Sequence, residues 1–154
     1  MHRLLRTFGP PCLAGLLATA ACALPARAAD AGPPSSYGDR LLAAVNDYRG
    51  SRGLQPLRPA AALQRIAAPH SQSMARSRQI SHTGFKGRFE LADSDLCVEN
   101  IAAGAFEPQE MLAAWRDSPA HDRNLLEPRV RWVGIATVQG YTTLFACESE
   151  GPRP

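Results

Sequence analysis

Two cysteines, Cys97 and Cys147, constrain the fold of this chain more than any other pair of residues. The other cysteines, Cys12 and Cys22, both lie in the N-terminal stretch. In an exported domain two cysteines most simply form one disulfide, with two buried free thiols as the alternative. A bond that closes a loop of this length stabilises a fold by roughly 4 kcal/mol in the chain-entropy model. The sequence contains no Cys-x-x-Cys pair, so it does not predict a thiol redox or zinc site of that type.

The first 28 residues have the pattern of a secretory signal peptide. Arg3 and Arg6 form a positive start, and a mostly apolar stretch follows from Pro11 to Leu24. Residues 26–28, with the sequence Ala-Arg-Ala, form a small-x-small cleavage motif. We therefore expect cleavage near Ala28 and a secreted or periplasmic protein. A lipoprotein signal at Cys22 is the weaker alternative, because position 19 lacks the usual aliphatic residue.

Removal of this segment changes the charge balance of the chain. The full sequence has 17 Lys and Arg against 14 Asp and Glu, and three of the arginines and no acid lie in residues 1–28. The remaining charges balance, so neither a nucleic-acid partner nor an electrostatically bound membrane is predicted. No later segment approaches the roughly 18 apolar residues of a membrane span. We expect a flexible leader over 29–37 and a single, monomeric domain over 38–150.

Apolar residues at helical spacing predict two long helices in the first half of this domain. The first runs from Gly38 to Arg52, where Gly53 is typical of a helix end. The second covers residues 60–79, with Pro59 as the residue that starts it, and Pro69 is expected to kink or break it near residue 65. Residues 81–95 are rich in Gly, Ser and Asp, which indicates an irregular loop.

The second half of the domain alternates between strands and helices. A short strand begins at Cys97, a helix begins near Pro108, and Ser118 with Pro119 is expected to cap a short helix. The segments RWVGIATV and YTTLFACE predict two strands joined by a tight turn at Gln139-Gly140. This order of elements predicts an α+β fold with a small antiparallel sheet between helices.

The strand CVENIA has an unusual distribution of side chains. Cys97, Glu99 and Ile101 point to one face, and Val98 and Asn100 point to the other. An acid that shares a face with a cysteine and an isoleucine is unusual for a surface residue. We expect Glu99 to accept backbone hydrogen bonds from loops, to orient a histidine, or to do both. Asn100 is expected to direct its amide into the loop network.

An ordered set of motifs resembles the CAP superfamily, which includes cysteine-rich secretory proteins, antigens and pathogenesis-related proteins. The motifs extend over roughly Leu41 to Cys147 and match best the SCP-like domains of exported bacterial proteins. This resemblance implies a three-layer α-β-α sandwich with an open cleft that contains two histidines and acidic residues. The matching segments are Asn46 and Arg49 before Gly53-Leu54, HSQSMA, SH, CVENIAAG, SPAHDRNLL and VGIA.

The resemblance also assigns candidate residues to the cleft. His82 matches its first histidine, Glu99 its first acid and His121 its second histidine. Many eukaryotic members have a second Glu where this chain has Ser118, and Asp117 lies one residue earlier. A mechanism with two carboxylates is therefore in doubt, although Asp117 is close enough in sequence to reach the edge of the cleft.

The three histidines beyond the signal segment have different expected roles. His82 and His121 are candidate metal ligands, with zinc as the candidate metal, because imidazole is the commonest metal ligand. A packed structural role is the alternative for each of them. His70 lies on the apolar face of the second helix, so we expect a buried, hydrogen-bonded core histidine, with a cleft role as the alternative.

Three functions are compatible with these features. Binding of a small apolar ligand, a lipid or a peptide in the cleft, with a divalent metal that orders the histidines, is ranked first. An envelope-associated structural or partner-binding domain is second, and a metal-assisted hydrolase is third. The sequence has no His-Glu-x-x-His, Gly-x-Ser-x-Gly or phosphate-loop motif, so no catalytic residue is assigned.

Overall fold

The computed structural model describes residues 36–104 and 106–152. The expected signal peptide at 1–28 and nearly all of the leader at 29–37 lie outside the described residues. Within the described ranges no helix is long and apolar enough to cross a membrane. In chain order the elements are α1 (Tyr37–Ser51), β1 (Arg58–Pro59), α2 (Ala61–Ser77), α3 (Phe85–Leu91), β2 (Cys97–Ala103), α4 (Pro108–Arg116), α5 (Pro119–Leu125), β3 (Trp132–Val138) and β4 (Tyr141–Cys147).

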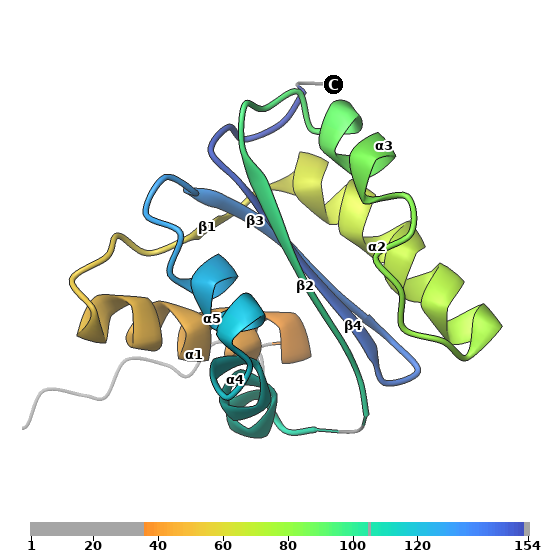
Figure 1. Cartoon of the computed structure of the whole chain (residues 1–154), viewed down its shortest axis with the longest axis horizontal. Helices are drawn as coiled ribbons and strands as arrows, with labels where there is room; N and C mark the ends of the chain where they lie inside the picture. Colours follow the sequence, from red (N-terminus) through yellow and green to blue (C-terminus); the bar gives the residue numbers. More distant parts are fainter. Residues whose placement is uncertain (1–35, 105, 153–154) are drawn as a thin grey trace, which may run out of the picture. The chain divides into compact units, whose positions relative to one another are not determined.

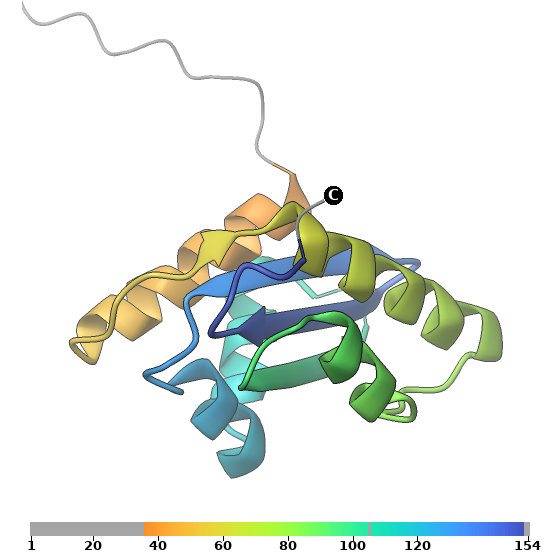
Figure 2. The ribbon, with the colours of Figure 1, turned by 90° about the horizontal axis from the view of Figure 1, so that it is seen from above.

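The strands form one sheet between two layers of helices. Its order is β1-β3-β4-β2, with β4 antiparallel to both neighbours and β1 parallel to β3 over two residues. Helices α2 and α3 cover one face of the sheet, and α1, α4 and α5 cover the other (Figure 1). Seen from above, the edge strand β2 lies between α3 and α5 (Figure 2). These observations confirm the predicted α+β sandwich.

A hydrophobic core lies on each face of the sheet because neighbouring residues of a strand point in opposite directions. On one face Val133 and Leu144 pack with α1, α4 and α5. On the other face Phe145 and Ala136 pack with α2. Full burial of a large apolar side chain contributes about 1.5–3 kcal/mol. Trp115 belongs to the first of these cores and is buried.

The start of α2 at Pro59 and the break near residue 65 are not observed. Pro59 does not start the helix; it lies in β1, and the next residue, Ala60, donates its N–H to the Val133 carbonyl. A proline fits such an edge strand because it has no N–H to pair. The helix also continues without a break past Pro69. Buried residues on both sides of the proline hold the helix against the sheet, and this tertiary packing outweighs the local cost of the proline.

The segment 81–95 is not wholly irregular, because it contains α3. The helix begins after Gly84, whose φ of 80° lies in the left-handed region that glycine tolerates best. It has seven residues, too few for a clear helical period in the sequence. Phe85 packs edge-on against Phe145 with ring centres 6.2 Å apart. A contact with a distant strand therefore helps to hold a helix that local sequence did not predict.

The turn and the disulfide match their predictions. Gln139 and Gly140 join β3 to β4 with φ values of 50° and 80°, as a two-residue hairpin turn requires. Cys97 and Cys147 are bonded and lie directly opposite each other on β2 and β4. The bond therefore attaches the first residue of the edge strand to the sheet beside the cleft described below.

Candidate functional site

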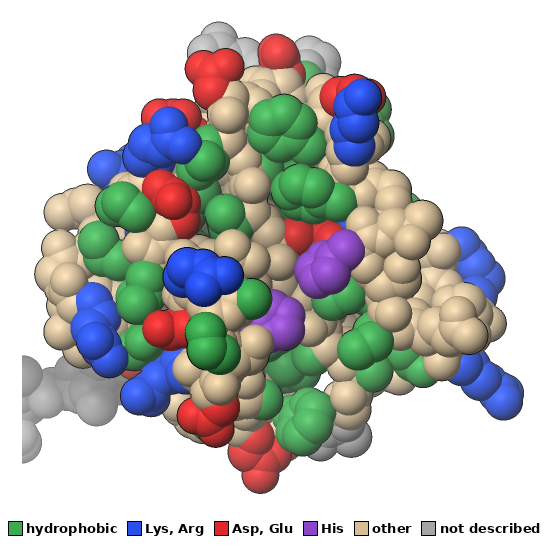
Figure 3. Space-filling model, in the orientation of Figure 1, with side chains coloured by type: hydrophobic (Ala, Val, Ile, Leu, Met, Phe, Trp, Pro, Cys, Tyr) green, Lys and Arg blue, Asp and Glu red, His purple; other side chains and the backbone are tan. Residues whose placement is uncertain are grey.

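A cleft of about 400 Å³ lies over the edge strand β2, between the two helical layers. Figure 3 shows histidine side chains gathered on this face beside an acidic side chain. The structure therefore brings His82, Glu99 and His121 to one cleft from three separate segments. The lining residues are His82, Phe85, Cys97, Val98, Glu99, Ala120, His121 and Asn124.

The alternation of β2 distributes the polar side chains between the two layers. Glu99 points toward α2 and α3, where it meets His82 and Arg88. Asn100 points toward α5, where its amide contacts the residues of the short helix. The cleft is thus built across the edge of the sheet, and each helical layer supplies one wall.

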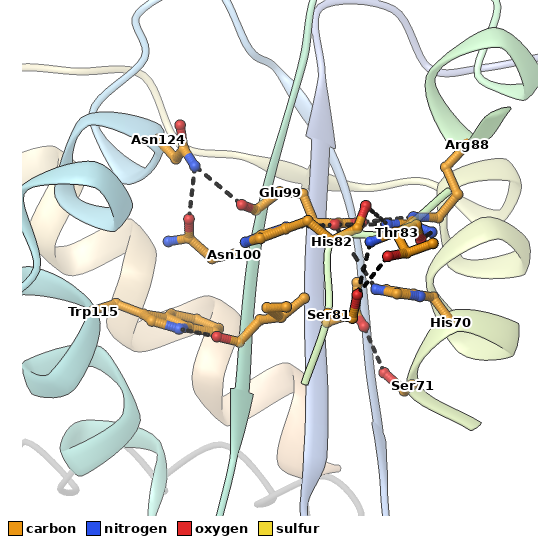
Figure 4. A network of polar contacts seen from close by, with 12 residues as sticks. His70, Ser71, Ser81, His82, Thr83, Arg88, Glu99, Asn100, Trp115 and Asn124 are labelled. Atoms are coloured by element: carbon orange, nitrogen blue, oxygen red, sulfur yellow. Dashed lines mark hydrogen bonds and ion pairs between the residues drawn. The ribbon is translucent and has the colours of Figure 1, made fainter. Parts of the chain in front are cut away.

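Glu99 lies at the centre of a buried polar network (Figure 4). Its side chain is 1% exposed, and both of its oxygens are occupied. Arg88 donates from Nε to Oε2 and from Nη2 to Oε1, each at 2.7 Å, and His82 Nδ1 lies 2.8 Å from Oε1. Glu99 was expected to accept backbone hydrogen bonds, to orient a histidine, or to do both. Its contact with His82 agrees with the second of these roles.

Arg88 is a site residue that the sequence did not predict. Besides its two bonds to Glu99, it donates to the carbonyls of Thr83 at 3.0 Å and His82 at 3.5 Å. It therefore holds both the carboxylate and the backbone of the loop that carries His82. One indication was present in the sequence, since a buried acid requires a cationic or hydrogen-bonding partner.

His70 is buried as expected, but it also belongs to this network. Its side chain is 8% exposed, and Nε2 lies 3.8 Å from Oε1 of Glu99 without a hydrogen bond. The remaining ring nitrogen bonds to the backbone of Ser81, so the expected hydrogen bonding is half satisfied. Burial lowers the pKa of His70, and the charge of Arg88 lowers it further, while Glu99 acts in the opposite direction.

The opposite wall is formed by α5. Ser118 occupies the N-cap position and Pro119 the first turn, which confirms the predicted helix start, although the serine side chain makes no capping bond. This start places His121 in the cleft one turn along the helix. Burial lowers the pKa of His121, and His82 lowers it further whenever His82 is protonated. Its imidazole is therefore neutral near pH 7.

Two asparagines connect this wall to β2. As predicted, Asn100 directs its amide into the network, where Nδ2 donates to the His121 carbonyl at 3.1 Å. Asn124, which the sequence did not single out, donates from Nδ2 to the carbonyl of Glu99 at 3.0 Å and to Oδ1 of Asn100 at 2.9 Å. Asp117 instead forms the C-cap of α4 and is not a lining residue, so the structure does not place it in the cleft.

The donor set does not fit a resident zinc ion. A catalytic zinc site uses three protein ligands and a structural site uses four. Both oxygens of Glu99 are held by Arg88, which leaves His82 and His121 as the candidate ligands in the cleft. In the described part of the chain no group of three or more His, Cys, Asp and Glu residues could hold a metal ion.

Comparisons of sequence agree with this architecture. The model of the cysteine-rich secretory protein family, CAP, matches residues 42–148. The chain is 29% identical over 112 residues to the "Uncharacterized protein YkwD" of Bacillus subtilis strain 168. This match covers 68% of the chain and 44% of the relative, so the chain spans less than half the length of that curated protein.

Solved structures show the same fold at lower sequence identity. An extracellular protein with an SCP domain from Bacillus anthracis has a TM-score of 0.69 and 22% identity, over 73% of this chain and 40% of that protein. An outer surface protein of Borrelia burgdorferi has a TM-score of 0.63 and 22% identity, over 75% and 97%. A cysteine-rich secretory protein of Staphylococcus aureus has a TM-score of 0.63 and 21% identity, over 76% and 40%.

Proposed function

The chain belongs to the cysteine-rich secretory protein (CAP) family, and from that premise we propose that the cleft over β2 binds a small, largely apolar ligand outside the cytoplasm. The observation that carries this proposal is the composition of the cleft. Phe85, Val98 and Ala120 supply apolar surface next to the imidazoles of His82 and His121. Open clefts with apolar walls and a few fixed polar groups are typical of small-molecule sites.

The contacts of β2 favour a small molecule over an extended peptide. A peptide that adds to the sheet as a strand needs the free carbonyls of the edge strand. Asn124 already donates to the carbonyl of Glu99, and the indole N–H of Trp115 donates to that of Ile101 at 3.3 Å. These side chains protect the edge, so a ligand would occupy the cleft without pairing with the strand.

Export is supported by two observations. The Cys97–Cys147 disulfide is typical of proteins that fold in an oxidising compartment. The similar structures include proteins described as extracellular and as an outer surface protein. We propose on this basis that residues 1–28 are removed as a signal peptide and that the domain acts in the periplasm or outside the cell.

Hydrolysis has weaker support than binding. The proposed hydrolase needs a metal held by His82, His121 and a further ligand with an open position for water. The bidentate ion pair with Arg88 already occupies the carboxylate of Glu99, which was the candidate for this third position. The two histidines alone fall short of the usual catalytic set.

A blocked cleft tests the binding proposal. Ala120 is an exposed lining residue on α5, so Ala120→Trp should fill the cleft without changing a core. Ala114→Trp is the matched control, because Ala114 is exposed on the neighbouring helix α4 and does not line the cleft. The probe is the neutral fluorophore N-phenyl-1-naphthylamine, whose emission rises in apolar surroundings.

We expect saturable binding of the probe by the wild type and by Ala114→Trp, and a loss of binding in Ala120→Trp. Equal binding by all three proteins would place the probe elsewhere and refute the cleft as the site. Absence of binding in all three would favour the alternative of a structural or partner-binding domain.

A further inference from the structure

We infer that the cleft recognises its ligand through the lone pair on Nε2 of His82, so that the ligand presents a hydrogen-bond donor, such as a hydroxyl or an amide group. This inference rests on the proposed binding function and specifies the chemistry of the ligand. It follows from the hydrogen bonds around His82, Glu99 and Arg88, in three steps.

The first step fixes the position of the imidazole proton. Glu99 is held by two donors of Arg88 in a bidentate ion pair, and a carboxylate in such a pair can only accept hydrogen bonds. Because His82 Nδ1 lies 2.8 Å from Oε1 of Glu99, Nδ1 must carry the proton. In a neutral imidazole the other nitrogen, Nε2, is then an acceptor.

The second step concerns access to Nε2. His82 lines the cleft and its side chain is 53% exposed, in contrast to the buried carboxylate that it contacts. Among the described residues, the hydrogen-bond partner of this imidazole is Glu99, which it contacts through Nδ1. Nε2 of His82 is therefore accessible to a ligand, while Nδ1 is already bonded.

The third step concerns the charge of the cleft. Arg88 lies beside the site, but its side chain is 11% exposed and is bonded to Glu99 and to the carbonyls of Thr83 and His82. It therefore has little capacity to bind an acidic ligand. The lone pair on Nε2 cannot bond an anionic head group, which has no donor hydrogen, whereas a neutral donor pairs with it.

Nitrogen NMR tests the proton position directly. In wild-type protein at pH 8, long-range ¹H–¹⁵N spectra should show Nδ1 of His82 protonated and Nε2 unprotonated, with the assignment made by loss of the signals in His82→Phe. A proton on Nε2, either alone or together with one on Nδ1, would overturn the inference.

Three probes of equal chain length test the ligand class. Decan-1-ol has a donor, decyl methyl ether has an acceptor only, and decanoate at pH 8 is an anion; each is measured by displacement of N-phenyl-1-naphthylamine. A neutral hydrogen bond makes a difference of roughly 2- to 10-fold in affinity, so decan-1-ol should bind about 5-fold more tightly than the ether. Decanoate should bind more weakly than decan-1-ol.

Two variants assign this preference to His82. The difference between decan-1-ol and the ether should disappear in His82→Phe and persist in Gln79→Ala, an exposed residue outside the polar network that does not line the cleft. Binding without preference, or a preference that survives in His82→Phe, would overturn the inference and leave the proposed binding function intact. Absence of binding by every probe would refute both.

Discussion

Replacement of Arg88 by methionine should destabilise the protein far more than replacement of an ordinary surface cation. The side chains of Arg88 and Glu99 are 11% and 1% exposed, so their ion pair is shielded from solvent. Arg88→Met would leave the carboxylate buried with only the contact to His82. Loss of one partner of a buried pair costs about 3–5 kcal/mol, because the remaining charge is uncompensated.

A double-mutant cycle separates this charge effect from lost packing. In Arg88→Met/Glu99→Gln the buried charge is removed as well, so the double variant should be about 2 kcal/mol more stable than Arg88→Met. Lys86→Met is the matched control in the same helix, because the pair of Lys86 with Glu90 is largely exposed. That substitution should cost less than about 1 kcal/mol.

Urea unfolding followed by circular dichroism measures the wild type, the two single variants Arg88→Met and Glu99→Gln, the double variant and the Lys86→Met control. With a slope of about 2 kcal/mol per molar urea, the midpoint of Arg88→Met should fall by about 2 M. The midpoint of Lys86→Met should change by less than about 0.5 M. The reasoning is wrong if Arg88→Met behaves like Lys86→Met, or if the double variant loses the sum of the two single effects.

Three further predictions concern the scaffold and its response to pH. Replacing Cys97 and Cys147 by serine should lower the free energy of unfolding by about 4 kcal/mol, because their bond closes a loop with a separation of 50 residues. An unchanged free energy of unfolding in calorimetry would contradict this prediction. Gly134→Ala should prevent close packing of α2 on the sheet, because the added Cβ would lie 2.3 Å from the helix backbone. Gly50→Ala is the comparison: its added Cβ would have no atom within 4 Å, so this substitution should stabilise α1 by about 0.5–1 kcal/mol. The melting temperatures of Gly134→Ala and Gly50→Ala are compared by thermal unfolding, and equal values would refute the packing argument. The lowered pKa of His70 means that the unfolded chain binds a proton before the folded one, so stability should be complete above the ordinary imidazole pKa of about 6.5 and decrease as the pH falls below it. His70→Leu should flatten this decrease between pH 7 and 5 in urea titrations, and an unchanged slope would exclude His70 as its source.

The features of the fold that the sequence predicted correctly depend on local or periodic patterns. The strand alternation placed Glu99 and Asn100 on opposite faces of β2, where their contacts lie. Glycine after Gln139 indicated the hairpin turn, and proline after Ser118 indicated the start of α5. In each case a short stretch of residues has one low-energy conformation whatever the rest of the chain does.

The errors occurred where a distant contact outweighs a local preference. Pro59 favours a helix start in isolation, but pairing with β3 makes it an edge-strand residue. Pro69 favours a break, but α2 continues through that position while packed on the sheet. Residues 81–95 have the composition of a loop, yet the contact of Phe85 with Phe145 helps to hold α3.

The sequence by itself determined the order of most elements, the pair of cysteines that bond, and the face of β2 on which each polar side chain lies. These properties depend on residues close together in the chain, or on the scarcity of one residue type. Only the tertiary structure decided that Arg88 and His70 join Glu99, and that Asp117 stays outside the cleft. These contacts and positions depend on how α2, α3 and α5 pack around the edge strand β2. The spacing of residues along the chain carries no information about that packing.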